Sequence, residues 1–86
     1  MTKAIYPGTF DPITYGQIDI AHRATELFDE VVIAVYARPT KNELFPIEER
    51  LAMVRETFKD QPLISVAEYD GLTVDFARAV EAKVIV

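Results

Sequence analysis

The 86-residue sequence contains no cysteine and a single histidine, His22. The absence of thiols excludes disulfides, thiolate nucleophiles and cysteine metal sites, and one histidine cannot form a histidine-rich metal site. We therefore expect no metal bound by the protein's own side chains. His22 itself is interpreted as a helix-surface or half-buried residue with no functional partner.

The chain also lacks any apolar run approaching the ~20 residues that span a bilayer. Its first residues, Met1–Ala4, lead directly into a strand pattern without the features of a signal peptide. The formal net charge of -5 disfavours non-specific binding to nucleic acid and docking on anionic membranes. We therefore expect a cytoplasmic protein that has neither a nucleic acid nor a membrane as a partner.

Short apolar runs alternate with amphipathic helical patterns along the whole chain. The runs predict strands at Lys3–Tyr6, Val31–Tyr36, Leu63–Tyr69 and Val84–Val86, and the patterns predict helices at Ile18–Phe28, at 46–58, and after an N-cap at Thr73. Because strands and helices alternate, the order β-α-β-α-β-α-β indicates the α/β class. We expect a parallel, Rossmann-like sheet with right-handed crossovers.

The last predicted strand, Val84–Val86, is apolar and has no following helix to cover it. An uncovered strand edge is a template for pairing with another chain. The sequence therefore predicts a homo-oligomer, formed by edge pairing or strand exchange between copies.

The stretch Tyr6–Gln17 combines the end of a strand, a glycine-containing loop and a helix start. The free N–H groups and the dipole of a helix N-terminus favour an anion, so this arrangement is typical of a phosphate site. Gly8 lets the backbone approach a ligand closely, and Thr9 offers a hydroxyl group. Lys41, in a loop expected at the same end of the sheet, adds a positive charge.

Ligands of open parallel sheets lie beyond the carboxyl ends of the strands. The loop after the third predicted strand reaches the same end and contributes Leu72 and Thr73, a small apolar surface with one hydroxyl group. These positions suit a ligand with a phosphate near the first helix and an apolar tail toward the third loop.

Two polar clusters also have purely structural interpretations. Thr14-x-x-Gln17 has the pattern of a capping box, in which each of the two residues satisfies the other's backbone N–H. Glu48, Glu49 and Arg50 are expected to form a solvated first turn of the second helix.

The same residues carry a resemblance to a known family. The run Tyr6–Gln17, YPGTFDPITYGQ, closely resembles the N-terminal signature of the bacterial pantetheine-phosphate adenylyltransferases, which belong to the nucleotidyltransferase superfamily with a T/H-x-G-H signature. The resemblance continues through Pro39–Lys41, Phe45–Arg50 and Gly71–Ala77, and it extends over essentially all 86 residues.

The resemblance implies transfer of an adenylyl group from ATP to 4′-phosphopantetheine, giving dephospho-coenzyme A and pyrophosphate in coenzyme A biosynthesis, with Mg²⁺ as cofactor. It implies that Thr9 contacts both substrates and that Phe10 borders ATP through its backbone. It further implies that Lys41 binds the phosphate of phosphopantetheine and that Thr73 lines the pantetheine arm. Gly8 and Leu72 complete the predicted substrate-binding set.

The sequence departs from this family in two ways. Gln17 occupies the position of the signature histidine that stabilises transition-state charge, and replacing such a donor costs roughly 10²–10³ in rate. The family's chains are also about twice as long, so residues 1–86 resemble an N-terminal half-domain that is catalytically incomplete.

Three interpretations remain open. The chain is half of an adenylyltransferase that needs the remaining chain, or a module that binds nucleotide or phosphate weakly without turnover. The third is an engineered or truncated half-domain that folds and self-associates without activity.

Overall fold

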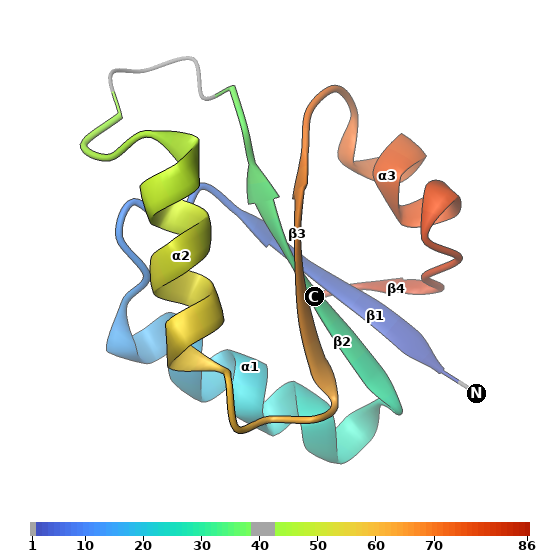
Figure 1. Ribbon diagram of the computed structural model, residues 1–86. Coiled ribbons are helices and arrows are strands. Elements are labelled where there is room, and N and C mark those ends of the chain that lie inside the picture. The colour runs from blue at the N-terminus through green and yellow to red at the C-terminus, as the bar shows by residue number, and fades with distance from the viewer. Residues whose placement is uncertain (1, 39–42) are drawn as a thin grey trace.

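A four-stranded parallel sheet in the order β3-β2-β1-β4 forms the centre of the molecule (Figure 1). The computed structural model describes residues 2–38 and 43–86. The elements, in chain order, are β1 (Lys3–Gly8), α1 (Tyr15–Leu27), β2 (Glu30–Tyr36), α2 (Ile47–Thr57), β3 (Ile64–Tyr69), α3 (Thr73–Ala79) and β4 (Val84–Ile85). The predicted alternation of strands and helices and the parallel sheet are confirmed.

The two faces of the sheet are covered by different helices. On β2, Val31, Ile33 and Val35 pack into one apolar cluster with residues of α1 and α2. Val32, which points the opposite way, packs with Ala77 of α3 in a second cluster. Because successive side chains of a strand alternate between faces, α1 and α2 form one layer and α3 the other (Figure 1).

The strand order reverses at β1. The chain moves outward from β1 through β2 to β3, then crosses back over the sheet to place β4 on the other side of β1. In open parallel sheets, ligands bind at such a reversal, beyond the carboxyl ends of the strands. The loops that follow β1 and β3, and residues 37–38 after β2, lie at this end, as the sequence predicts.

The element boundaries differ from the predicted ones at several places. Helix α1 begins at Tyr15 rather than Ile18, because Thr14 is the N-cap of the helix. Leu27, an apolar residue within the predicted helix Ile18–Phe28, is 76% exposed. Val86 lies beyond the end of β4, although its N–H still donates to the carbonyl of Ile5 at 2.9 Å.

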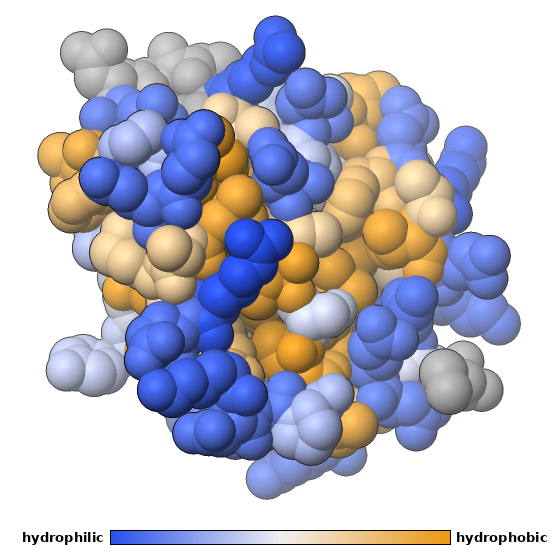
Figure 2. Space-filling model, viewed as in Figure 1, coloured by the Kyte–Doolittle hydropathy of each residue, from blue (hydrophilic) through white to orange (hydrophobic). Residues whose placement is uncertain are grey.

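Hydrophobic side chains gather toward the middle of the face seen in Figure 2, with polar side chains over much of the surrounding surface. The exposed large hydrophobic residues include Leu63, which is 42% exposed, and Val86, which is 43% exposed. Within the described ranges, none of the helices has the length and apolar character that a membrane crossing requires.

Candidate functional site at the carboxyl end of the sheet

The turn after β1 is shaped by Gly8 and Phe10. A Cβ atom on Gly8 would lie 3.0 Å from Cε2 of the Phe10 ring, so this ring packs directly on the glycine. Phe10 has φ of +52° and its side chain is 2% exposed, in edge contact with Tyr6 at a centroid distance of 5.6 Å. With its ring in the core, Phe10 has only its backbone to offer a ligand.

Tyr6 lies beneath this turn. Its burial raises the pKa of the phenol above the ordinary value of 10.0, because the charged phenolate loses solvation in an apolar site. Tyr6 is therefore a neutral, packing residue of the site at physiological pH.

The start of α1 is closed by the predicted capping box. The N–H of Gln17 donates to Thr14 Oγ1 at 3.2 Å, and the N–H of Thr14 donates to Gln17 Oε1 at 2.9 Å. The capping interpretation of Thr14-x-x-Gln17 is confirmed. The side-chain oxygen of Gln17 is thus occupied by the helix cap, and an amide cannot carry the positive charge of an imidazolium.

Arg50 is the residue that sequence reasoning placed wrongly. It was expected in a solvated first turn of α2, but it is 0% exposed. Its Nη1 donates to the carbonyls of Thr9 at 2.9 Å and Tyr36 at 2.7 Å, and its Nε donates to the carbonyl of Phe45 at 2.9 Å. The burial of Arg50 could have been inferred from its spacing, because position 50 lies three residues after Ile47 and therefore on the same side of α2.

Two carboxylates bond to Arg50 or to the segment that precedes α2. Glu43 Oε2 pairs with Arg50 Nη2 at 2.8 Å. Asp11 accepts from the backbone N–H groups of Leu44 at 2.5 Å and Phe45 at 2.8 Å. The turn after β1 and the segment 43–45 are therefore joined by charged hydrogen bonds, which are stronger than neutral ones.

The third loop also differs from its prediction. Thr73 was expected to be the N-cap of the third helix, but Leu72 holds that position and Thr73 is the first helical residue. The Thr73 hydroxyl instead lies 3.0 Å from the Tyr69 hydroxyl. Leu72 is 70% exposed, so its side chain is available at this end of the sheet.

A continuous series of contacts links the first and third loops. Thr9 is bonded to Arg50, Arg50 to Tyr36, and the rings of Tyr36 and Tyr69 lie 5.3 Å apart. Tyr69 then contacts the Thr73 hydroxyl. Thr9 and Thr73 are thus linked through intervening residues at the same end of the sheet. Lys41 lies outside the described residues, and Gln17 is bonded to Thr14 rather than to this series.

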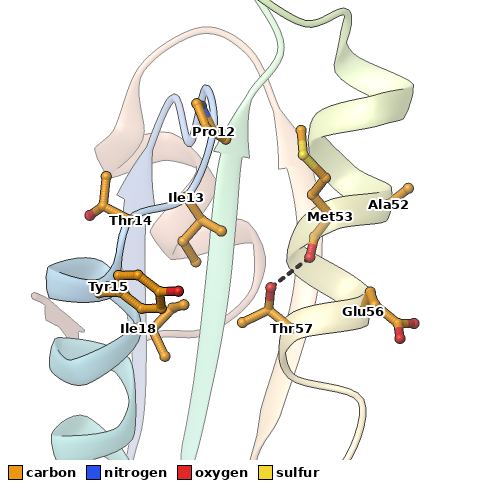
Figure 3. Close-up of a pocket in the computed structure, with 9 residues that line it drawn as sticks. All are labelled: Pro12, Ile13, Thr14, Tyr15, Ile18, Ala52, Met53, Glu56 and Thr57. Carbon is orange, nitrogen blue, oxygen red and sulfur yellow. Dashed lines mark hydrogen bonds between the residues drawn. The ribbon is translucent and has the colours of Figure 1, made fainter.

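A separate groove of about 760 Å³ opens between the start of α1 and α2 (Figure 3). Ile13 and Ile18 line one side, and Met53 lies on the other. The full lining is Pro12, Ile13, Thr14, Tyr15, Ile18, Ala52, Met53, Glu56 and Thr57. None of the predicted site residues within the described ranges lines this groove, so the groove is separate from them.

Comparisons with known proteins place this architecture in a family. The Cytidylyltransferase-like family model matches residues 5–86. Phosphopantetheine adenylyltransferase of Symbiobacterium thermophilum is 56% identical over all 86 residues, which correspond to 53% of that protein. The proteins of the same name from a Roseiflexus species and from Bacteroides fragilis are 52% and 50% identical, over 54% and 57% of their lengths. The chain spans about half the length of the curated relatives it matches.

Among solved structures, the NadR protein in complex with NAD and AMP-PNP matches 93% of this chain and 26% of its own chain, with a TM-score of 0.76. At 24% identity, this likeness concerns the fold alone, an open Rossmann-like parallel sheet. The family model extends over nearly every residue of the chain. The chain belongs to the cytidylyltransferase-like family.

Proposed function

We propose that residues 1–86 form the nucleotide- and phosphopantetheine-binding half-domain of a phosphopantetheine adenylyltransferase. The observation that carries this proposal is identity of 50% or more, over the full chain, with relatives of that name. The placement of Thr9 and Thr73 after β1 and β3, at the same end of the sheet, supports it, because two substrates that react must bind side by side. A role in coenzyme A biosynthesis also leads us to propose a cytoplasmic location.

Each predicted site residue has a role in this proposal. Gly8 and the backbone of Phe10 border ATP, and Thr9 contacts both substrates at the start of α1. Lys41 binds the phosphate of 4′-phosphopantetheine. Thr73, together with the exposed side chain of Leu72, lines the pantetheine arm.

In the adenylyl transfer, an oxygen of the acceptor phosphate attacks the α-phosphorus of ATP, and pyrophosphate leaves. The protein's main contribution to such a step is positioning and stabilisation of charge. Gln17 stands where the family's signature histidine would supply that charge, and its oxygen is engaged by Thr14. We therefore propose that this chain alone binds substrates without measurable turnover.

Mg²⁺ enters the proposal only as the ion that accompanies ATP. The described residues include no group of three His, Cys, Asp or Glu side chains that could hold a metal ion. No residue of this chain is assigned to Mg²⁺, and no step is derived through it.

Binding is tested by titration calorimetry of the 86-residue chain with ATP and, separately, with 4′-phosphopantetheine. Lys41→Ala should weaken phosphopantetheine binding roughly 10-fold or more, since a hydrogen bond to a charged group contributes about 1.5–3 kcal/mol. Lys59→Ala is the matched control, because Lys59 is exposed and pairs with Glu56 on α2. Equal heats for the wild-type chain and Lys41→Ala would remove Lys41 from the site.

Turnover is tested by pyrophosphate release from ATP plus 4′-phosphopantetheine. The proposal expects none above the enzyme-free background. Robust release by the purified chain would overturn the assignment of Gln17 as a capping residue without a catalytic role.

A second candidate function is self-association without activity. Among the described strands, β4 pairs with β1 alone, and Ile85 is 47% exposed. We also propose that two copies pair through Val84–Val86, because an open apolar edge offers unpaired backbone groups to a second chain.

A further inference from the structure

Arg50 is a buried cation whose hydrogen bonds all go to backbone and side chains at one end of the sheet. It is 0% exposed, and its guanidinium contacts Thr9, Tyr36, Phe45 and Glu43. Burying a guanidinium is costly, and an apolar side chain of similar size often stabilises a core as well or better. Packing alone therefore does not account for an arginine at this position.

The partners of Arg50 belong to three different segments. Thr9 lies in the turn after β1, Tyr36 ends β2, and Phe45 precedes α2. All three partners are backbone carbonyls, so the guanidinium fixes the direction of three peptide groups. A peptide whose carbonyl is held also has its neighbouring N–H direction set, because the peptide unit is planar.

Asp11 holds the same segment from the opposite side. Its two carboxylate oxygens accept the N–H groups of Leu44 and Phe45. Arg50 accordingly takes the Phe45 carbonyl while Asp11 takes the Phe45 N–H. The N–H of Phe45 is thereby bonded directly to the turn after β1, through Asp11. Its carbonyl is bonded to Arg50, which in turn donates to Thr9 of that turn.

We propose that Asp11 and Arg50 form a positioning clamp, which presets the backbone of residues 9–11 against segment 43–45 before ligand binds. This inference rests on the proposed nucleotide-binding function. Arg50 is a positioning residue rather than a catalytic one, since its guanidinium is fully enclosed and its donors are committed to protein acceptors. The ligand class is a nucleoside triphosphate, recognised by backbone groups of the preset turn.

The clamp predicts that ligand affinity depends on the planar, multiply donating shape of the Arg50 guanidinium and not only on its charge. Lysine keeps the charge but presents a compact ammonium, which cannot bond several diverging carbonyls in the same geometry. Arg50→Lys should therefore weaken ATP binding roughly 10-fold or more, because it misplaces the turn. Asp11→Asn, which removes the charge and one of two acceptor oxygens, should act in the same direction.

The control is Val54→Ala, on the same helix and also 0% exposed. It lowers the melting temperature by removing core volume, and it takes away none of the clamp's hydrogen bonds. Titration calorimetry with Mg²⁺-ATP, at a temperature where each variant is folded, should give a Kd within about twofold of wild type for Val54→Ala. If Arg50→Lys and Asp11→Asn weaken ATP binding no more than Val54→Ala does, the clamp has no positioning role.

A second readout separates the clamp from the proposed function. Amide hydrogen exchange at Leu44 and Phe45 should accelerate roughly 10-fold in Asp11→Asn while the strands stay protected. If the wild-type chain binds no ATP, the proposed function fails and exchange alone decides the clamp. Faster exchange confined to Leu44 and Phe45 then supports the clamp. Exchange that accelerates throughout the sheet, or that does not accelerate at all, refutes the clamp. Should Arg50→Lys not fold, Asp11→Asn and Glu43→Gln supply both readouts.

Discussion

At the residue scale, Gly8 is the position where the site is most tightly built. Its missing side chain lets the Phe10 ring approach to within 3.0 Å of the place a Cβ would occupy. Gly8→Ala would push this buried ring away, and overpacking of this kind costs about 1–3 kcal/mol. Urea unfolding should show a lower midpoint with an unchanged slope.

Gly16 is the matched control for Gly8. A Cβ at Gly16 would meet only Thr14 Oγ1, at 3.9 Å, and the residue lies inside α1. Gly16→Ala should raise stability by about 0.4–1 kcal/mol, because alanine loses less backbone entropy in a helix. Equal effects of the two substitutions would contradict the close packing of Gly8 on Phe10.

Tyr6 predicts a pH dependence with a definite sign. Burial raises its pKa above 10.0, so the native state holds the phenol proton more tightly than the unfolded chain does. The stability contributed by Tyr6 is complete below pH 10.0 and is lost as pH rises through its native pKa. Melting temperatures measured from about pH 9 to about pH 11 should fall less steeply for Tyr6→Phe than for wild type.

Tyr15 provides the comparison, because its side chain is 92% exposed. Tyr15→Phe should follow the wild-type melting curve through the same alkaline range. An identical alkaline decline in wild type, Tyr6→Phe and Tyr15→Phe would show that Tyr6 does not contribute to it.

At the scale of the element, α1 depends on the capping box formed by Thr14 and Gln17. Thr14→Ala removes the acceptor for the Gln17 N–H and should cost about 1 kcal/mol in urea unfolding. The control is Thr57→Ala, since the exposed Thr57 hydroxyl donates to Met53 within α2. That change should leave stability within about 0.5 kcal/mol of wild type. Similar losses for both would mean that the cap adds nothing.

Elements of this fold were predictable where the signal is local. The capping box occupies four adjacent residues, and the apolar run at Val31–Tyr36 already indicates a strand covered on both faces. Both predictions are confirmed. Local pattern also placed the loops after β1, β2 and β3 at one end of the sheet, because parallel strands leave no other arrangement.

Features that depend on distant partners were not predictable in the same way. Arg50 is polar and follows two glutamates, so composition indicated a solvated turn, yet Thr9 lies 41 positions away in sequence and accepts its hydrogen bond. Thr73 has the composition of an N-cap, but its hydroxyl contacts Tyr69 instead. The roles of Thr9, Lys41 and Thr73 toward ligands remain predictions that the binding experiments test.

At the scale of the whole molecule, the two faces of the sheet are unequally covered. Helices α1 and α2 lie over one face, and among the described elements only the short α3 lies over the other (Figure 1). The cluster under α3 has three buried residues, Ile5, Val32 and Ala77. Hydrophobic surface on this side therefore remains open near the β4 edge, where Ile85 is 47% exposed.

This open edge predicts association in solution. Light scattering at ~100 µM should give a mass above that of one 9.7 kDa chain, because an apolar strand with one open edge pairs with its copy at such concentrations. Ile85→Lys should return the mass to that of a monomer, since a lysine on an edge strand opposes pairing.

Leu27→Lys, the same kind of change at a 76% exposed position on α1, should leave the mass of the wild-type assembly unchanged. A monomeric wild-type chain would exclude pairing through β4, whereas loss of the oligomer in Leu27→Lys but not in Ile85→Lys would move the interface to α1.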